Sequence, residues 1–231
     1  MIKSIVKSIL LNKPVARLLI KPALKLHSSA YKWASRWGLV LNDNVHPKHR
    51  IIDYSGWFTK NISAGQVVME IGSGAGYLTA ALAEKAGFVY AIEISPRLLE
   101  EARAKNSAAN IEYICADALT YDYQTARPVD CVVMSNVLEH IRDRVTLLKR
   151  IVSLVNWAEP GKKEILLRVP MFNRDWIVPY KRELNVEWRL DKSHEVEYTT
   201  ELLREELSQA NIEISRYEIC FGEAYVVCRA I

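Results

Sequence analysis

The chain has 231 residues, of which half are hydrophobic and a quarter are charged, with nine glycines and eight prolines. This composition is that of an ordinary globular protein, and it excludes collagen-like, wholly disordered and disulfide-scaffold classes. The four cysteines form no CxxC pair and no metal-ligand spacing, and each lies in an apolar run, which indicates a reducing compartment.

The net charge of +4 is distributed unevenly along the chain. Residues 1–42 contain eight Lys or Arg and no Asp or Glu, so the remainder has a net charge of −4. Apolar residues at helical spacing predict a basic helical extension over residues 1–47, with breaks near Pro14 and Pro22. We expect residues 1–42 to dock on an anionic membrane surface, and the alternative is a helical lid packed on the main domain.

Lysine and arginine interrupt every apolar stretch of the first 42 residues. The chain has no run of about 18 uncharged apolar residues, and a secretory h-region is also absent, so we expect a cytoplasmic protein, free or peripheral on the inner face of the membrane. Mitochondrial targeting stays open, because the extension is basic, amphipathic and free of acidic residues.

From Gln66 onwards, short apolar runs alternate with helical patterns. The alternation predicts βαβ units in an α/β, Rossmann-like and mostly parallel seven-stranded sheet, over a domain of residues 48–231. The last two strands are too close to enclose a helix, which predicts an antiparallel hairpin at one edge. The expected strands are 66–71, 88–93, 111–116, 129–135, 163–169, 212–219 and 224–229, and the expected helices are about 76–86, 96–107, 139–155 and 199–210.

The strongest motif is V-V-M-E-I-G-S-G-A-G, residues 67–76, in which a β-branched strand runs into three alternate glycines. Glycine lets the backbone turn sharply and approach a ligand closely at the carboxyl end of a strand. The plainer interpretation is a tight strand-to-helix turn. The next strand ends at Glu93, which could accept both hydroxyls of a ribose, although a surface glutamate would also fit. Asp117 then offers an acceptor for the amine of an adenine.

Four segments together resemble the ordered motifs of class I S-adenosylmethionine-dependent methyltransferases, of the type 11/12 kind. In chain order they are E-I-G-S-G-A-G, A-I-E-I, A-D-A-L and S-N-V-L-E-H-I. The resemblance covers residues 48–231 and implies S-adenosylmethionine as the cofactor. The G-x-G-x-G loop lacks a third glycine at the dinucleotide spacing, which favours this cofactor over NAD.

The same resemblance implies the site residues. The methionine and sugar end of the cofactor should be lined by Glu70, Gly72, Ser73, Gly74 and Gly76, and Glu93 should hold the ribose. The adenine should be flanked by Ile94, and its edge should meet Asp117 and Ala118. The methionine part should be closed over by Ser135 and Asn136.

Methyl transfer to a hydroxyl requires alignment of the acceptor and removal of its proton. We expect His194 to accept that proton and His140 to shape the pocket. We expect no resident metal. The alternative is an N/O metal-ligand set in which Asn136, Glu139 and His140, at positions i, i+3 and i+4, share one helix face and are joined by the distant His194.

Residues 170–195 show no clear period and are rich in aromatic residues and arginines, which predicts a substrate lid or insertion; a structured insertion with core aromatics is the alternative. We expect O-methylation of a small-molecule, glycan or lipid-linked acceptor. Nucleic acid is disfavoured, because the main domain is net acidic. Two other functions stay open, a non-catalytic S-adenosylmethionine-binding regulatory protein and an NAD-dependent oxidoreductase.

Overall fold

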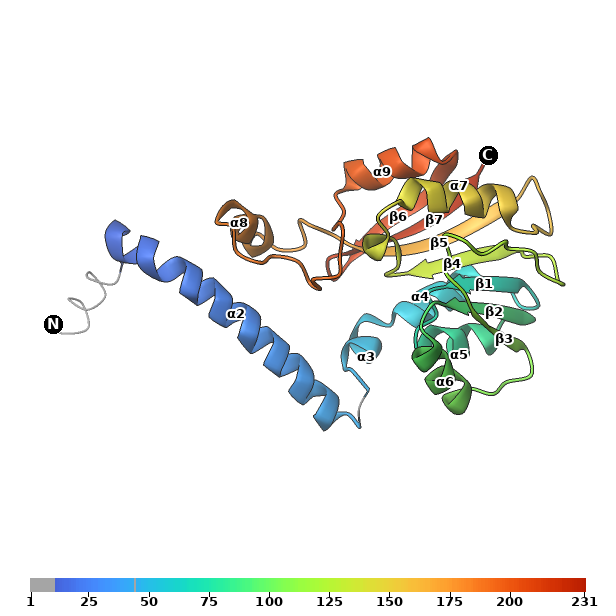
Figure 1. Ribbon diagram of the computed structural model, residues 1–231, viewed down its shortest axis with the longest axis horizontal. Coiled ribbons are helices and arrows are strands. Elements are labelled where there is room, and N and C mark those ends of the chain that lie inside the picture. Colours follow the sequence, from blue (N-terminus) through green and yellow to red (C-terminus); the bar gives the residue numbers. More distant parts are fainter. Residues whose placement is uncertain (1–10, 44) are drawn as a thin grey trace. The chain divides into compact units, whose positions relative to one another are not determined.

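The computed structural model describes residues 11–43 and 45–231 (Figure 1). The chain forms two compact units, one from Met1–Ile51 with Asp175–Leu190 and the other from Ile52–Arg174 with Asp191–Ile231. Most of the segment expected as a lid of the main domain therefore groups with the N-terminal helix. The expected helical pattern in residues 1–10 lies outside the described residues.

The first unit is built on one long helix, α2 (Lys13–Leu41). Asn12 caps it, with Oδ1 accepting the Val15 N–H at 3.0 Å. Pro14 lies in the first turn, where the missing N–H has no helical partner in any case. Pro22 lies inside the helix, so the predicted break there is wrong: the helix continues past the one hydrogen bond that proline cannot make.

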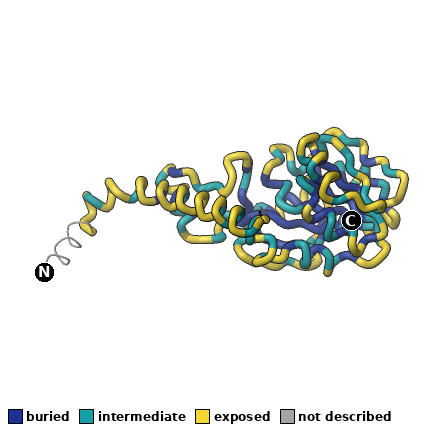
Figure 2. Tube along the Cα trace, turned by 90° about the horizontal axis from the view of Figure 1, so that it is seen from below, coloured by how far each residue is buried: buried dark blue, intermediate teal, exposed yellow. Residues whose placement is uncertain are grey.

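The insertion helix α8 (Ile177–Glu183) packs on α2. Lys181 is buried, and its Nζ donates to Ser28 Oγ at 3.0 Å. Much of α2 is exposed to solvent (Figure 2). Its exposed residues include the large apolar Trp33 and Trp37. None of the helices in the described part of the chain is long and apolar enough to cross a membrane.

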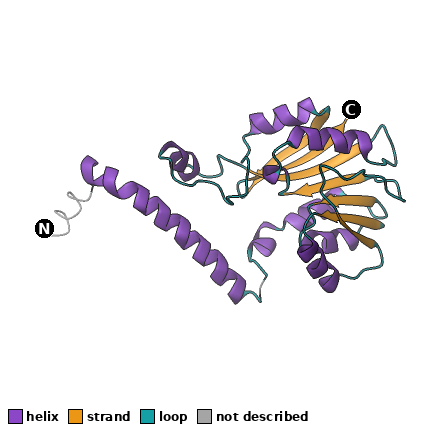
Figure 3. Cartoon of the chain, in the orientation of Figure 1, coloured by secondary structure: helices purple, strands orange, loops and turns teal. Residues whose placement is uncertain are grey.

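The second unit contains a sheet of strands, drawn in orange in Figure 3. The sheet has seven strands in the order β3-β2-β1-β4-β5-β7-β6. The first five strands are parallel, and β7 runs antiparallel to both β5 and β6. The predicted Rossmann-like sheet with an antiparallel edge is confirmed. The strands are β1 (Val67–Ile71), β2 (Phe88–Glu93), β3 (Ile111–Cys115), β4 (Cys131–Ser135), β5 (Lys163–Pro170), β6 (Ile212–Cys220) and β7 (Glu223–Ala230).

Helices cover both faces of this sheet (Figure 1). One core cluster joins the sheet to α4 (Tyr54–Asn61) and α5 (Tyr77–Ala83) through residues such as Phe58 and Leu82. The other joins it to α7 (Arg144–Leu154) and α9 (Thr200–Gln209) through Leu148 and Leu207. Two further helices are α6 (Pro96–Lys105) and α3 (Lys48–Ile52), and most of α3 belongs to the first unit.

One predicted helix is divided. Residues 139–155 were expected to be continuous, whereas the structure has a short 3-10 helix, η1 (Leu138–His140), followed by α7. Asp143 separates the two, because its side chain accepts the Thr146 N–H at 3.3 Å and so begins a new helix. The difference changes which side chains can meet near His140.

Candidate functional site

The candidate site lies at the carboxyl ends of β1 and β4, which are adjacent in the sheet. After β1 the chain continues outward through β2 to β3, and it then returns to β4 on the other side of β1. This reversal is the topological switch point at which open α/β sheets bind ligands. Gly72 follows β1 and Asn136 follows β4, so the two predicted motifs meet at this crevice.

The three glycines of the loop after β1 all have positive φ, but they serve different purposes. A Cβ at Gly72 would lie 2.4 Å from Val137 Cγ2, and one at Gly76 would lie 2.9 Å from Ala102 Cβ. A Cβ at Gly74 would meet no heavy atom of the described residues within 4 Å. Packing therefore requires glycine at 72 and 76, whereas Gly74 presents bare backbone to open space.

Replacing Gly72 by alanine should destabilise the fold by about 2–4 kcal/mol, because the new Cβ would be strained at positive φ and would overlap Val137. Urea unfolding followed by circular dichroism measures the change. Gly161→Ala is the matched control, since a Cβ at Gly161 meets no described atom within 4 Å. Equal stability of the two variants would contradict this assignment of the loop.

Two buried carboxylates lie beside the loop. Glu93 accepts the Gly74 N–H on Oε2 and the Ser95 N–H on Oε1, both at 2.9 Å. Because each carboxylate oxygen has two lone pairs, Glu93 can still accept a hydroxyl on each side. Glu70 accepts the Thr79 hydroxyl at 2.6 Å, and burial, reinforced by the charge of Glu93, raises the pKa of Glu70 to about 7.

Two buried polar atoms line the crevice without a hydrogen-bond partner among the described residues, Ser73 Oγ and Asn136 Oδ1. Asn136 adopts φ +55° and donates from Nδ2 to Glu223 Oε1 at 3.2 Å. Ser135 Oγ accepts from Arg168 at 3.1 Å. Because buried polar groups are nearly always satisfied, the orphaned oxygens beside the open face of Gly74 fit a polar ligand such as the predicted cofactor.

The predicted adenine-binding residues follow β2 and β3 at the same edge. Asp117 accepts the Leu119 N–H on Oδ1 at 2.9 Å, which holds the turn after β3, and the Ala118 carbonyl accepts the Tyr123 hydroxyl at 2.6 Å. Ile94 is 64% exposed, so its side chain offers an apolar surface to a flat ring. The contacts of these three residues with adenine stay predictions.

His140 and His194 are far apart in the sequence, and they meet because the loop before α9 is tied to η1: Ser193 Oγ, 53 residues from His140, lies 3.0 Å from His140 Nδ1. The Glu195 and Val196 N–H groups donate to the Glu139 carbonyl at 2.7 and 3.3 Å. The imidazole centroids are 4.7 Å apart in an edge-to-face arrangement. One potential ligand atom each from Glu139, His140 and His194 lies within 4.8 Å of the others.

Neighbouring oxygens orient both imidazoles. His194 is buried, and its Nδ1 lies 3.2 Å from Glu197 Oε1. His140 is exposed, and its Nδ1 lies 3.0 Å from Ser193 Oγ. Burial and the adjacent His194 lower the pKa of His140.

Glu139 is fully buried, and burial raises the pKa of its carboxyl to about 8. The expected sharing of one helix face by Asn136, Glu139 and His140 is not observed, because η1 is a single 3-10 turn. Asn136 bonds to Glu223 and lies outside the group of three.

Sequence reasoning missed a buried ion pair that borders the crevice. Arg168 of β5 contacts Glu223 of β7 with Nη2 and Oε2 2.5 Å apart, and its guanidinium lies 4.1 Å from the centroid of the Tyr54 ring. Burial raises the pKa of the Tyr54 phenol. The available signal was a charged residue inside an otherwise apolar strand, in L-L-R-V-P.

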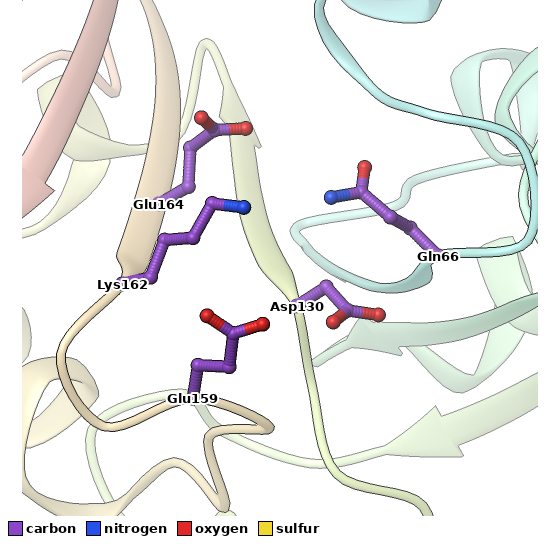
Figure 4. A pocket seen from close by; sticks show the side chains of 5 residues that line it. All are labelled: Gln66, Asp130, Glu159, Lys162 and Glu164. Atoms are coloured by element: carbon purple, nitrogen blue, oxygen red, sulfur yellow. The ribbon is translucent and has the colours of Figure 1, made fainter.

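A small polar pocket lies at the opposite, amino-terminal end of the strands (Figure 4). Its side chains precede or begin β1, β4 and β5, and Asp130 Oδ2 accepts the Val67 N–H at 2.7 Å. It is separate from the crevice and contains none of the predicted site residues. The lining residues are Gln66, Asp130, Glu159, Lys162 and Glu164.

Comparison with known proteins matches residues 68–157 to a methyltransferase domain family. The chain is 39% identical over 106 residues to the ribosomal RNA small subunit methyltransferase A of Rubrobacter xylanophilus, covering 45% of this chain and 40% of that protein. It is 32% identical over 103 residues to a ubiquinone biosynthesis O-methyltransferase of Coxiella burnetii, covering 43% and 42%. The chain thus spans about two fifths of the length of these relatives.

Among solved structures, the chain resembles the N-methyltransferase NodS of Bradyrhizobium japonicum in complex with S-adenosyl-L-homocysteine. The TM-score is 0.61 at 17% identity, and the match covers 91% of this chain and 97% of NodS. This likeness is one of fold, and it extends over nearly the whole of both chains.

The expected partners need correction. The sequence disfavoured nucleic acid and restricted the partners to small-molecule, glycan or lipid-linked acceptors and an anionic membrane surface. That restriction is wrong, because relatives matched over part of the chain are named as methyltransferases of ribosomal RNA. The physical reason is that phosphate binding depends on local Lys and Arg, so the net negative charge of a whole domain does not exclude it.

Proposed function

We propose that this chain, which belongs to the class I S-adenosylmethionine-dependent methyltransferases and takes S-adenosylmethionine as its cofactor, transfers a methyl group to a hydroxyl oxygen. The proposal rests on two features that follow β4 and lie close together in the sequence and in the fold. Asn136, whose buried oxygen has no hydrogen-bond partner among the described residues, borders the cofactor crevice, and Glu139 and His140 follow within one turn.

Bound S-adenosylmethionine supplies an electrophilic methyl group, whose bond to sulfur breaks with the electron pair left on sulfur as the bond to the acceptor oxygen forms. The chain's own residues bind the cofactor and orient it. Glu93 is proposed to accept the ribose hydroxyls, the bare backbone at Gly74 to allow close approach, and Ser73 Oγ and Asn136 Oδ1 to take polar groups of the methionine part.

The histidine cluster, defined as Glu139, His140 and His194, is proposed to receive the acceptor hydroxyl and to ease the loss of its proton. A hydroxyl is a poor nucleophile until its proton begins to leave, and positioned imidazoles are the commonest groups that assist this step. His140 is exposed, which gives the proton a path to solvent. The resemblance to an O-methyltransferase supports the choice of oxygen.

Turnover with S-adenosylmethionine tests the proposal against its rivals. Isothermal titration should show binding of S-adenosylmethionine and none of NAD, which separates the methyltransferase from an oxidoreductase. Formation of S-adenosylhomocysteine that depends on an added acceptor separates it from a regulatory protein without turnover. Binding without product, over a broad set of acceptors, would contradict the proposed enzyme.

A second candidate for the methyl acceptor is RNA, which is favoured by the similarity to ribosomal RNA methyltransferases. The described part of α2 offers a suitable arrangement of charge and aromatic rings. It carries six Lys or Arg and no acidic residue, the Trp33 and Trp37 centroids are 5.8 Å apart, and the Arg36 guanidinium lies 5.2 Å from the Trp33 ring. Cations attract phosphates, and exposed indoles stack on bases.

A labelling experiment identifies the acceptor class. The protein is incubated with methyl-labelled S-adenosylmethionine and either total RNA or an RNA-free extract, and the labelled product is digested and analysed by mass spectrometry. Label on a ribose oxygen would support RNA and oxygen together. Label on a base nitrogen would support RNA and contradict the hydroxyl acceptor, and label confined to the RNA-free extract would contradict RNA.

Replacing Glu93 by alanine should weaken S-adenosylmethionine binding by about 1–3 kcal/mol, because two hydroxyls would lose a charged acceptor and the Gly74 N–H would lose its partner. Calorimetry measures the affinity. Glu93→Gln keeps the shape and one acceptor oxygen, so its loss should be smaller. Unchanged affinity in a folded Glu93→Ala variant would show that the ribose binds elsewhere.

A further inference from the structure

The histidine cluster brings together three side chains of the types that bind metal ions in proteins. Glu139 and His140 come from η1, and His194 comes from the loop that precedes α9. One ligand atom from each lies within 4.8 Å of the others. Three atoms on one small ion stand about 3–4 Å apart, since each bond to the ion is about 2.0–2.2 Å long, so small side-chain movements would complete such a site.

Glu139 differs from the buried acids around it. Its side chain is 0% exposed, and neither of its oxygens has a hydrogen-bond partner within residues 11–43 and 45–231. Three buried acids near it each have a cationic partner: Glu223 pairs with Arg168, Glu197 with Arg174 and Glu206 with Arg144. A buried carboxylate without a partner is costly, so the cluster lacks a positive charge that a bound cation would supply.

Hydrogen bonds behind the cluster set the direction of both rings. The Ser193 hydroxyl donates to Asp191 Oδ1 at 2.8 Å, so its oxygen accepts from His140 Nδ1–H. His194 Nδ1 faces the Glu197 carboxylate, which can only accept from it when ionised. Both rings therefore carry their proton on Nδ1, and Nε2 holds the lone pair for a ligand bond. Outer carboxylates and hydroxyls orient metal-binding histidines in the same manner.

We infer that Glu139, His140 and His194 form a binding site for one divalent first-row transition-metal ion, with coordination positions left open for the oxygen of the methyl acceptor. Two imidazoles and one carboxylate suit ions such as Zn²⁺ or Mn²⁺, whereas Mg²⁺ and Ca²⁺ prefer oxygen ligands alone. Three protein ligands with an open position are typical of catalytic rather than structural sites. The role assigned to the open position rests on the proposed methyl transfer to a hydroxyl.

In that role the cation polarises the acceptor hydroxyl, whose proton leaves to solvent water at the exposed side of His140 while the oxygen keeps the electron pair that attacks the methyl group. The two histidines then act as ligands and not as bases. This is the alternative ligand set considered from the sequence, without Asn136, and the geometry favours it over the expectation of no metal.

The full chain, stripped of metal with chelator and dialysed, is titrated with Co²⁺, Mn²⁺ and Mg²⁺. We expect one Co²⁺ per chain with visible d–d bands from mixed nitrogen and oxygen ligands, one Mn²⁺ per chain, and much weaker Mg²⁺ binding. Glu139→Gln and His194→Ala should each weaken Co²⁺ and Mn²⁺ binding at least about 100-fold, and Ser193→Ala about 10-fold. Glu195→Gln, an exposed acid next to His194, is the matched control and should change nothing.

Absence of Co²⁺ bands, or bands that survive both Glu139→Gln and His194→Ala, would overturn the inference and return the histidines to the role of bases. Ser193 is exposed, so Ser193→Ala keeps the test valid if a buried variant fails to fold. Calorimetry with S-adenosylmethionine is run on the same samples. If the unaltered chain binds the cofactor but no metal, the metal site alone is refuted. If the unaltered chain binds neither the cofactor nor the metal, the proposed function is refuted as well.

Discussion

Replacing His194 by alanine should lower kcat by about 10²- to 10⁴-fold while leaving S-adenosylmethionine affinity nearly unchanged. His194 is buried beside Glu139, and its Nδ1 bond to Glu197 holds the ring toward the proposed acceptor position. Its loss removes the group that acts on the acceptor hydroxyl, whether as a metal ligand or as a base. The residues proposed to hold the cofactor lie at the ends of β1, β2, β3 and β4 or in the loops that follow these strands, and they are unaltered.

Steady-state kinetics with the identified acceptor and calorimetry with the cofactor measure the two effects separately. His49→Ala, which removes a histidine of α3 outside the cluster, is the control and should keep kcat within about twofold of the unaltered chain. Near-normal turnover of His194→Ala would show that the acceptor binds elsewhere or needs no proton removal. An equal fall in cofactor affinity would show that the substitution disturbed the crevice as a whole.

Replacing Gly74 by valine should abolish S-adenosylmethionine binding, a loss of about 100-fold or more, while most of the fold persists. The Cβ of residue 74 points into space that holds no described atom within 4 Å, so the branched side chain would occupy the volume proposed for the cofactor. Positive φ adds strain of about 1–3 kcal/mol, because β-branched residues rarely adopt it.

Calorimetry measures the loss of binding, and circular dichroism shows whether the sheet persists. Gly74→Ala adds only one methyl group at the same φ and should bind more weakly than the unaltered chain but better than Gly74→Val. The order of the two variants separates occupied volume from backbone strain, since strain acts in both. Normal binding by Gly74→Val would mean that the loop glycines serve only the turn after β1.

The sequence by itself determined the sheet and most of its boundaries. Strand and helix periodicities depend on which face of each element is buried, and this information is local. The strands at 67–71 and 88–93 begin and end within one residue of their predicted positions. The turn after β1 could also be predicted, because a backbone with positive φ selects glycine. The sequence did not show that neighbouring side chains require glycine at 72 and 76, whereas Gly74 faces open space.

The tertiary structure alone decided which distant groups meet. His194 reaches His140 because the loop before α9 donates two backbone hydrogen bonds to the Glu139 carbonyl, a contact that no local pattern encodes. The pairing of Arg168 with Glu223 depends on the register of β5 against β7. The course of α2 past Pro22 and the grouping of residues 175–190 with that helix could not be predicted either, since a proline removes one backbone hydrogen bond and does not by itself decide where a helix ends.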